Sequence, residues 1–452
     1  MSYYGFRQSK YNKTVEDFFL ANRNLPWPIA MFSIVATETS VLTFISVPGL
    51  AYQGNWHFLQ LAFGYILGRI LVSVFLLPQY FKKPITSIYE ILGEKYGKGI
   101  QKTASGVFLI TRILADGIRF LATATIVHVI SGWSLPVAVL IIGVVTIFYT
   151  ILGGIRTIVW IDSFQFLLYI GGGLLSIFFA IHYLPTSLTE TFAALNELDK
   201  FALFKFDGNL FTDSYFFISA LIGGAFLSFA SHGADYMMVQ RVLGTSNLSS
   251  ARKAMIGSGI FVTIQFAIFL LAGSLIYMYY NGMPMEKDRE FASFIVDVLP
   301  VGIKGILFAG VLSAAMSTLS SSINSLASST ITDWGIAKTI KNSRVASFVW
   351  AIVLMGMALF FDEGNTSIVI LGLQIASFTY GGLLGLFILS KLDREFQPAS
   401  LILGLIGSLV IVLFLKQTGL AWTWYIACAV TMNIIIVYLS DFIMTGRFRV
   451  NQ

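Results

Sequence analysis

Long apolar stretches separated by short polar linkers run through the chain from end to end. Stretches of about 18 to 30 residues are long enough to cross the hydrocarbon core of a bilayer as helices. Apart from 81–102, 185–213 and 281–301, the linkers are short and leave no room for a soluble domain. The pattern therefore predicts an all-α, polytopic membrane protein with about twelve transmembrane helices. The expected spans are 27–50, 58–80, 103–131, 134–152, 157–184, 214–240, 255–280, 302–331, 344–361, 367–390, 397–416 and 421–444.

Two of these spans are interrupted by polar residues near their centres. The first carries ATETS at 36–40 and Pro-Gly at 48–49, and the sixth carries SHGAD at 231–235. Consecutive polar residues cannot all face a packed partner, so we expect unwound backbone around a cavity, where freed carbonyls can hold an ion. Because the interrupted spans are five apart, the pattern favours two inverted five-helix repeats with a binding site between them. The alternative is that these polar residues only form hydrogen bonds between packed helices.

The eighth span is unusually rich in hydroxyl groups. Eleven of the twenty residues from 313 to 332 are Ser or Thr. Helical spacing of three and four places five polar residues on one face: Ser317, Ser320, Ser321, Asn324 and Ser328. Oxygen atoms stacked in this way suit a hard monovalent cation such as sodium. The alternative is that the hydroxyls bond their own backbone one turn back and let helices pack closely.

Composition agrees with a membrane protein, since 56% of the residues are hydrophobic and 12% are charged. The net charge of +6 does not indicate a nucleic-acid partner, because about 20 of the 29 Lys and Arg residues lie in alternate loops and the two tails. The positive-inside rule then predicts that both termini are cytoplasmic. We expect a multi-pass protein of the plasma membrane, the inner membrane of a bacterium. A single cysteine, Cys428, excludes a disulfide within the chain.

Five motifs in order resemble the sodium:solute symporter family. They are VEDFFLANRNLPW at 15–27, ATETSVLTFISVPG at 36–49, VWIDSFQ at 159–165, DYMMVQR at 235–241 and LPVGIKGILFAGVLSAAMSTLSSSINS at 299–325. The resemblance covers nearly the whole chain. It implies a LeuT-type core of two inverted five-helix repeats at 27–184 and 214–390. Segment 1–26 would then be a cytoplasmic N-terminal segment, 185–213 an external loop, and 391–452 two trailing helices with a cytoplasmic tail.

The resemblance also implies a function. Members of the family are sodium-coupled symporters that import small organic solutes by alternating access, so the implied coupling ion is Na⁺ and no enzymatic activity is expected. The implied partners are the solute, sodium ions and the lipid bilayer, with no obligate protein partner. One departure is that family members usually carry an extra helix before the VEDFFLA-like segment, whereas this chain begins almost at that segment.

Carried over by motif, the family's sodium site falls between the first and eighth spans. It comprises the carbonyls of Ala36, Thr39 and Ala314 and the side-chain oxygens of Ser317 and Thr318. Neutral oxygens in a desolvated pocket bind sodium while still allowing its release. A second sodium site, present in some members, would fall on Asp162, Ser320 and Ser321. The alternative for Asp162 is a solvated helix cap at the membrane edge.

The family's solute pocket lies between the first, second, third, sixth and tenth spans. Its candidate residues here are Thr37, Thr43, Gln60, Tyr65, Arg119, Ser228 and His232. Arg112, Asp116 and Arg119 share one face of the third span, and two arginines against one aspartate leave a positive charge that suits a carboxylate. We therefore expect an acidic solute resembling sialic acid, a monocarboxylate or pantothenate.

Two alternatives remain for this cluster and its neighbours. Asp116 could pair with one arginine while the other contacts backbone or another helix, in which case the solute is a sugar or another neutral molecule. Glu38 is a further candidate partner for a membrane arginine, Arg69 included. Other functions on the same scaffold, a channel or sensor and a membrane-embedded enzyme, remain as competing hypotheses.

Overall fold

The computed structural model describes residues 2–10, 12–39, 41–360 and 368–446, and within them the secondary structure is helical apart from one isolated bridge between Leu25 and Thr245. Ser40, the boundary between the ninth and tenth predicted spans, and the end of the predicted C-terminal tail lie outside the described residues. The helices up to the middle of the chain are α1 (Ser2–Ser9), α2 (Val15–Leu20), α3 (Trp27–Glu38), α4 (Val41–Gln53), α5 (Leu59–Leu71), α6 (Leu77–Tyr80), α7 (Tyr89–Tyr96), α8 (Lys98–Ser131), α9 (Leu135–His182) and α10 (Leu188–Glu197).

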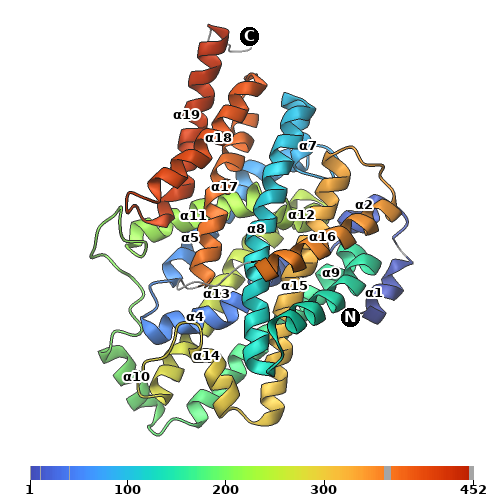
Figure 1. The fold of residues 1–452 in the computed structure, drawn as a ribbon. Helices are drawn as coiled ribbons and strands as arrows, with labels where there is room; N and C mark the ends of the chain where they lie inside the picture. The colour runs from blue at the N-terminus through green and yellow to red at the C-terminus, as the bar shows by residue number, and fades with distance from the viewer. Residues whose placement is uncertain (1, 11, 40, 361–367, 447–452) are drawn as a thin grey trace.

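The second part of the chain continues in the same manner (Figure 1). Four short turns lie between helices along the whole chain. The 3-10 turn η1 (Ala21–Arg23) follows α2, and the 3-10 turn η4 (Trp422–Trp424) precedes the last helix. The π-helical turns η2 (Val72–Leu76) and η3 (Phe294–Val298) follow α5 and α14. The helices are α11 (Phe217–Gly233), α12 (Tyr236–Leu243), α13 (Leu248–Tyr279), α14 (Glu290–Ser293), α15 (Val301–Asp333), α16 (Ile340–Phe360), α17 (Ile368–Ser390), α18 (Pro398–Leu415) and α19 (Tyr425–Thr445).

Both spans predicted to be interrupted are broken where the polar residues lie. The chain bends by 62° between α3 and the helix that follows it, and by 62° between α11 and α12. In the second break Asp235 leaves the helical conformation and its side chain accepts a hydrogen bond from the backbone N–H of Met237, which caps α12. The breaks interrupt the helices at the polar residues, as the sequence predicted.

The helix α9 contains two of the predicted spans. It is 48 residues long, which is more than twice the length that crosses a bilayer. Gly154, with φ of 62° and ψ of −167°, interrupts the helical conformation between the two parts. A side chain at Gly154 would also collide with the backbone oxygen of Phe18, 2.7 Å from an ideal Cβ. Glycine is therefore required there for both conformation and space.

The predicted number of spans is consistent with the described helices. Seven are long and apolar enough to cross a membrane, and the two bent pairs bring the number to nine. The break in α9 adds another span. The remaining two predicted spans correspond to α8, whose centre carries Arg112, Asp116 and Arg119, and to α17. The fold is thus an all-helical, multi-pass membrane architecture.

Close helix packing depends on small residues. An ideal Cβ on Gly64 would lie 2.4 Å from the carbonyl oxygen of Leu221, and one on Gly68 would lie 2.3 Å from that of Ala225. From the other side, a Cβ on Gly224 would lie 2.2 Å from the oxygen of Leu61. The backbones of α5 and α11 therefore touch directly, an arrangement typical of membrane helices with glycines four residues apart. This contact places the second span against the broken sixth.

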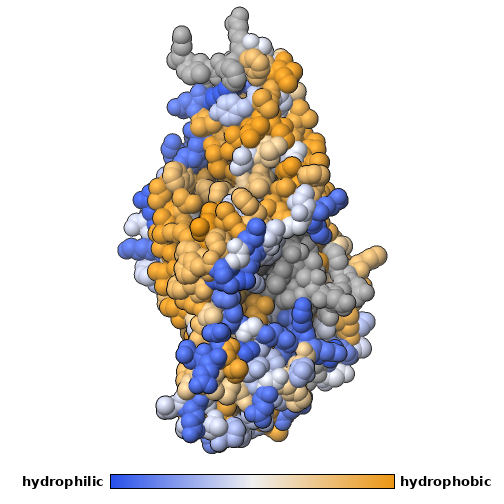
Figure 2. All heavy atoms as spheres, turned by 90° about the vertical axis from the view of Figure 1, so that its left-hand side faces the viewer, coloured by the Kyte–Doolittle hydropathy of each residue, from blue (hydrophilic) through white to orange (hydrophobic). Residues whose placement is uncertain are grey.

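The outer surface is apolar over broad areas. Figure 2 shows the side on which α10 and α11 lie, where hydrophobic residues cover much of the face and hydrophilic ones gather in separate patches. Large side chains such as Phe148, Phe164 and Phe178 are more than half exposed. Such a surface is stable in contact with lipid chains rather than water.

Candidate functional site

A small cavity lies where the broken first span meets the hydroxyl-rich helix α15. Its volume of about 10 Å³ is enough for one particle the size of a water molecule. Four of the five residues predicted to bind the first sodium line it: Ala36, Thr39, Ala314 and Ser317. The other lining residues are Gln165, Phe166 and Tyr169 from α9. The cavity therefore has room for a single small particle beside several of the predicted sodium ligands.

The fifth predicted residue, Thr318, is buried but does not line the cavity. Its hydroxyl lies 3.4 Å from the carbonyl oxygen of Ala314, one turn back on the same helix, and donates to it. This is a long hydrogen bond. A small rotation of the hydroxyl would therefore free both oxygens, those of Thr318 and Ala314, for a cation.

Asp162, predicted for the second sodium site, accepts a hydrogen bond from Ser317, which is predicted for the first. It is fully buried, so the alternative in which it is a solvated helix cap is wrong. One carboxylate oxygen accepts a hydrogen bond of 2.7 Å from Ser317, and the other accepts one of 2.7 Å from Ser33 on α3. The carboxylate is thus one hydroxyl away from the cavity and contributes negative charge to it.

Arg241, which the sequence analysis did not single out as a site residue, lies beside Asp162. Its guanidinium is fully buried, with Nη2 3.8 Å from a carboxylate oxygen of Asp162. The same group donates hydrogen bonds to Ser33 at 3.1 Å, to Ser321 and to the backbone oxygen of Met237. Ser321 also lies 3.1 Å from the hydroxyl of Thr37. A buried cation therefore already occupies the surroundings of Asp162 and Ser321.

The packing interpretation of the hydroxyl-rich helix holds at some positions, and at others the polar side chains contact a neighbouring helix. Ser320 donates to the backbone oxygen of Ser317 at 3.0 Å, as the packing alternative expects. By contrast, Asn324 accepts a hydrogen bond of 2.9 Å from Gln240 and Ser328 lies 2.7 Å from the hydroxyl of Tyr236. Together with Ser321 and Arg241, these contacts join the predicted polar face of α15 to α12, the second half of the broken sixth span.

The charged residues on α8 form a larger group than the sequence indicated. Arg112 contacts Asp116 at 3.2 Å, and its other nitrogen contacts Asp235 from the break between α11 and α12 at 2.9 Å. The hydroxyl of Tyr380 on α17 donates to Asp235 at 2.5 Å. The net positive charge expected from Arg112, Asp116 and Arg119 is therefore neutralised by Asp235, since two arginines face two aspartates. Sequence spacing could not show this, because Asp235 comes from a distant helix.

Arg119 is nevertheless the less satisfied of the two arginines. Its Nη1 is buried with no hydrogen-bond partner and lies 3.8 Å from Asp116, beyond hydrogen-bond distance. On α11, the hydroxyl of Ser228 and Nε2 of His232 are also buried without a partner. Buried polar atoms are normally paired. Three of the predicted solute-binding residues thus offer hydrogen-bonding atoms that the described protein groups do not use.

Glu38 and Arg69 form the ion pair that the sequence analysis considered. Arg69 is fully buried, bonds Glu38 through one nitrogen and donates to Ser258 at 2.7 Å through another. Nε2 of His232 lies 3.7 Å from the same carboxylate. Tyr65 is buried within electrostatic range of both Glu38 and Arg119. Glu38, at the break after α3, therefore belongs to the same region as the predicted solute residues, although it was not among them.

The remaining predicted solute residues are engaged with the protein. Thr37 is bonded to Ser321, and Thr43 is buried beside Tyr169. The amide of Gln60 donates to the backbone oxygens of His57 and Tyr215 and accepts from the backbone N–H of Lys205, so it fixes the segment between α10 and α11 to the start of α5.

Comparisons with known proteins agree with the motifs. The family model described as the sodium:solute symporter family matches residues 18–390. The sodium/sialic acid symporter NanT of Aliivibrio fischeri is 28% identical over 450 residues, covering 95% of this chain and 88% of the relative. The sodium/sialic acid symporter SiaT of Proteus mirabilis is 28% identical over 431 residues, covering 90% and 85%.

Solved structures resemble this one in the same way. A sodium-coupled sialic acid symporter in a substrate-bound, outward-open state superimposes with a TM-score of 0.88 at 26% sequence identity, over 98% of this chain and 95% of that one. The transporter Mhp1 in a closed conformation, at 14% identity, has a TM-score of 0.64 and covers 95% of both chains, which shows the shared fold alone.

Proposed function

Because the chain belongs to the sodium:solute symporter family, it is a sodium-coupled membrane transporter and not an enzyme, and we propose that it imports a small acidic solute by alternating access. Sialic acid, a monocarboxylate or a pantothenate-like acid are the candidates. The observation that carries this proposal is the buried Nη1 of Arg119, which has no hydrogen-bond partner among the described residues. A guanidinium group is well suited to bind a carboxylate through two hydrogen bonds.

The proposed solute pocket lies between the two ion-paired groups. Arg119, Ser228 and His232 would supply the unused hydrogen-bonding atoms. Tyr65 is buried within electrostatic range of Glu38, Arg69 and Arg119. Thr37, Thr43 and Gln60 complete the proposed set, although they are engaged with the protein in the present conformation.

The first of two proposed sodium sites is the cavity between α3 and α15. The proposed ligands are the carbonyls of Ala36, Thr39 and Ala314 and the hydroxyls of Ser317 and Thr318. The ion-sized cavity lined by four of these residues supports the assignment. Since Ala36 and Thr39 come from the broken helix and the other three from α15, an ion between them would hold the two helices together.

A second sodium is proposed at Asp162, Ser320 and Ser321. The carboxylate of Asp162 accepts a hydrogen bond from Ser317, which lines the first cavity, and a cation beside this buried carboxylate would be strongly favoured. Arg241 now neutralises this charge. Binding of a second sodium therefore requires Arg241 to move away from Asp162 and Ser321.

The membrane arrangement follows from the same proposal. Repeats at 27–184 and 214–390 would each begin with a broken span, the external loop would be 185–213, and 391–452 would follow the core. The excess of basic residues in alternate loops supports a plasma-membrane protein with both termini cytoplasmic.

Uptake of labelled solutes into proteoliposomes tests the choice of solute. With an inward sodium gradient, we expect saturable accumulation of one of the acids and none of glucose. Arg119→Ala should lower the affinity for that acid at least tenfold, since a charged hydrogen bond contributes about 1.5 to 3 kcal/mol. Arg119→Lys should recover part of the loss. The control is Lys102→Gln, an exposed change at the far end of the same helix.

A neutral sugar is the second candidate, because Asp116 and Asp235 together balance Arg112 and Arg119. Sodium-driven accumulation of glucose that survives Arg119→Ala would establish this alternative and refute the acidic solute. Efflux without saturation would indicate a channel instead.

A further inference from the structure

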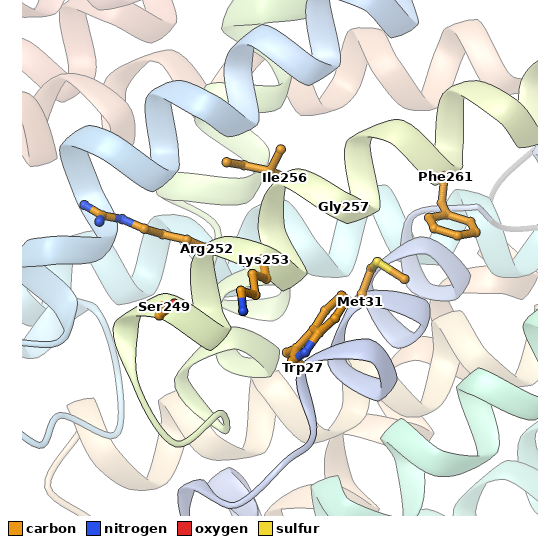
Figure 3. A pocket seen from close by; sticks show the side chains of 8 residues that line it. All are labelled: Trp27, Met31, Ser249, Arg252, Lys253, Ile256, Gly257 and Phe261. Atoms are coloured by element: carbon orange, nitrogen blue, oxygen red, sulfur yellow. The ribbon is translucent and has the colours of Figure 1, made fainter.

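A groove separate from the proposed transport sites lies between the start of α3 and the first four turns of α13. Its volume is about 450 Å³. Figure 3 shows the residues that line it, which come from these two helices. They are Trp27, Met31, Ser249, Arg252, Lys253, Ile256, Gly257 and Phe261.

The groove has a polar, basic end and an apolar remainder. Ser249, Arg252 and Lys253 form the basic end, and Figure 3 shows Lys253 on the side that faces Trp27. Met31 and Phe261 lie farther along the groove. A surface with this division fits a molecule that carries a charged group on an apolar chain. None of the lining residues is acidic, so the charged group must be an anion.

The positive charge at this end is not neutralised by the protein. Nε of Arg252 donates to the backbone oxygen of Ser73 at 2.9 Å, which fixes that side chain at the edge of the groove. Lys253 is exposed, and no ion pair or hydrogen bond of its side chain occurs within the described part of the chain. Its ammonium group is therefore available to a ligand.

The position of the groove favours a lipid headgroup as the anion. Both α3 and α13 enter the apolar part of the protein here, and Trp27 is 38% exposed, as expected for a side chain at the boundary of membrane and water. Basic pockets between membrane helices at this depth bind the headgroups of anionic lipids. We propose that the groove binds an anionic phospholipid, with its phosphate at Lys253 and Ser249 and an acyl chain along Met31 and Phe261.

Such a lipid would bridge two elements of the transport core. The rings of Phe32 on α3 and Phe261 on α13 pack edge to face at 5.3 Å. Met31 lies directly over Gly257, where an ideal Cβ would be 2.6 Å from its sulfur. Because α3 also carries Ala36, lipid bound here contacts the helix that forms one wall of the ion-sized cavity.

Native mass spectrometry of the delipidated full-length protein tests the site without any transported solute. We expect phosphatidylglycerol to bind more tightly than phosphatidylcholine of the same chain length. Lys253→Gln should weaken phosphatidylglycerol binding about fivefold, the effect of one basic residue near a membrane surface. Lys253→Arg should keep it. The matched control, Lys102→Gln, removes another exposed lysine that does not line the groove and should leave binding unchanged.

Three results would overturn the proposal. These are equal binding of the two lipids, an equal loss in Lys253→Gln and Lys102→Gln, or inorganic phosphate that binds the wild type as tightly as the lipid does. Since Lys253 is exposed, its replacement should leave the thermal unfolding temperature unchanged, which separates lost binding from lost folding. The assay requires neither sodium nor solute, so its failure leaves the symport proposal intact, and the reverse also holds.

Discussion

At the scale of single residues, the buried charges are held in pairs. Arg241 lies beside Asp162, Arg112 contacts two aspartates, and Arg69 binds Glu38. Burying one charge without a partner costs several kcal/mol. Removing one member of a pair therefore leaves the other charge buried at a high cost in free energy. A sodium ion or a charged solute that replaces one partner changes which conformation of these charged residues is favoured.

Thr318 offers the simplest test of the first sodium site. Thr318→Ala should raise the sodium concentration for half-maximal transport about tenfold, because an oxygen bonded to a charged group contributes about 1.5 to 3 kcal/mol. Sodium titration of uptake measures this change. Ser325→Ala on the same helix is the control, since that hydroxyl donates only to the backbone oxygen of Ser322. An unchanged sodium requirement in Thr318→Ala would remove Thr318 from the site.

Asp162 and Arg241 can be tested as a coupled pair. Asp162→Asn leaves Arg241 buried without its counter-charge, so we expect the free energy of unfolding to fall by about 3 kcal/mol or more. Asp162→Asn combined with Arg241→Gln should cost less than the sum of the single changes, with a coupling of about 1 to 3 kcal/mol. Thermal or denaturant unfolding in detergent gives the free energy of unfolding of the wild type, the two single variants and the double variant. Strict additivity would show that the two groups do not interact.

The same Asp162→Asn variant tests the second sodium. If Asp162 binds an ion, the number of sodium ions moved per solute should fall by one, as measured from reversal potentials in proteoliposomes. An unaltered ratio would exclude Asp162 from sodium binding, whatever its effect on stability.

At the scale of elements, the broken helices and α15 act together. The break after α3 exposes Ala36 and Thr39 to the cavity, and the break before α12 directs Asp235 to Arg112. On α15, one face contacts α12 through Ser321, Asn324 and Ser328. The proposed sodium ligands and the contacts to the sixth span thus share one helix, so an ion bound on α15 can affect both broken spans.

The direct backbone contact between α5 and α11 gives a prediction at this scale. Gly64→Ala places a Cβ 2.4 Å from the oxygen of Leu221 and forces the helices apart. Overpacking of this kind costs about 1 to 3 kcal/mol, so the thermal unfolding temperature should fall. Gly171→Ala is the control, because an added Cβ meets no heavy atom within 4 Å. Equal effects of the two changes would contradict the close contact.

Much of the fold could be predicted from the sequence, because apolar length and polar interruptions are local properties. The two breaks and the change of direction within α9 fall where the predicted spans end or are interrupted. Partners from distant helices could not be predicted. Asp235 lies more than a hundred residues from Arg112, and Arg241 lies in a short amphipathic segment where an arginine would ordinarily face water.

The proposed site shows the same limit. Helical spacing correctly placed Ser321, Asn324 and Ser328 on one face of α15, and the Glu38–Arg69 pair was among the pairings considered. Spacing could not show that Gln60 fixes the segment between α10 and α11, because its partners, Lys205 and Tyr215, are more than 140 residues away. The signal that would have revealed Arg241 is that a buried Asp162 needs a nearby cation.

At the scale of the whole molecule, the protein is a bundle of membrane helices (Figure 1) in which buried polar contacts connect α15 to both broken spans. Each sodium entering a cell contributes about 2.3 kcal/mol per 100 mV of membrane potential. The central claim is that sodium binds in the cavity between α3 and α15 and holds these helices together. A ligand that binds only the folded state raises its stability in proportion to the logarithm of concentration over Kd.

Thermal unfolding of the purified protein in sodium chloride and in choline chloride of equal ionic strength tests this claim most directly. The unfolding temperature should rise with sodium concentration but not with choline, and Ser317→Ala with Thr318→Ala should diminish the rise. Equal unfolding temperatures of the wild type in the two salts, or an undiminished sodium response in the double variant, would contradict sodium binding at this cavity.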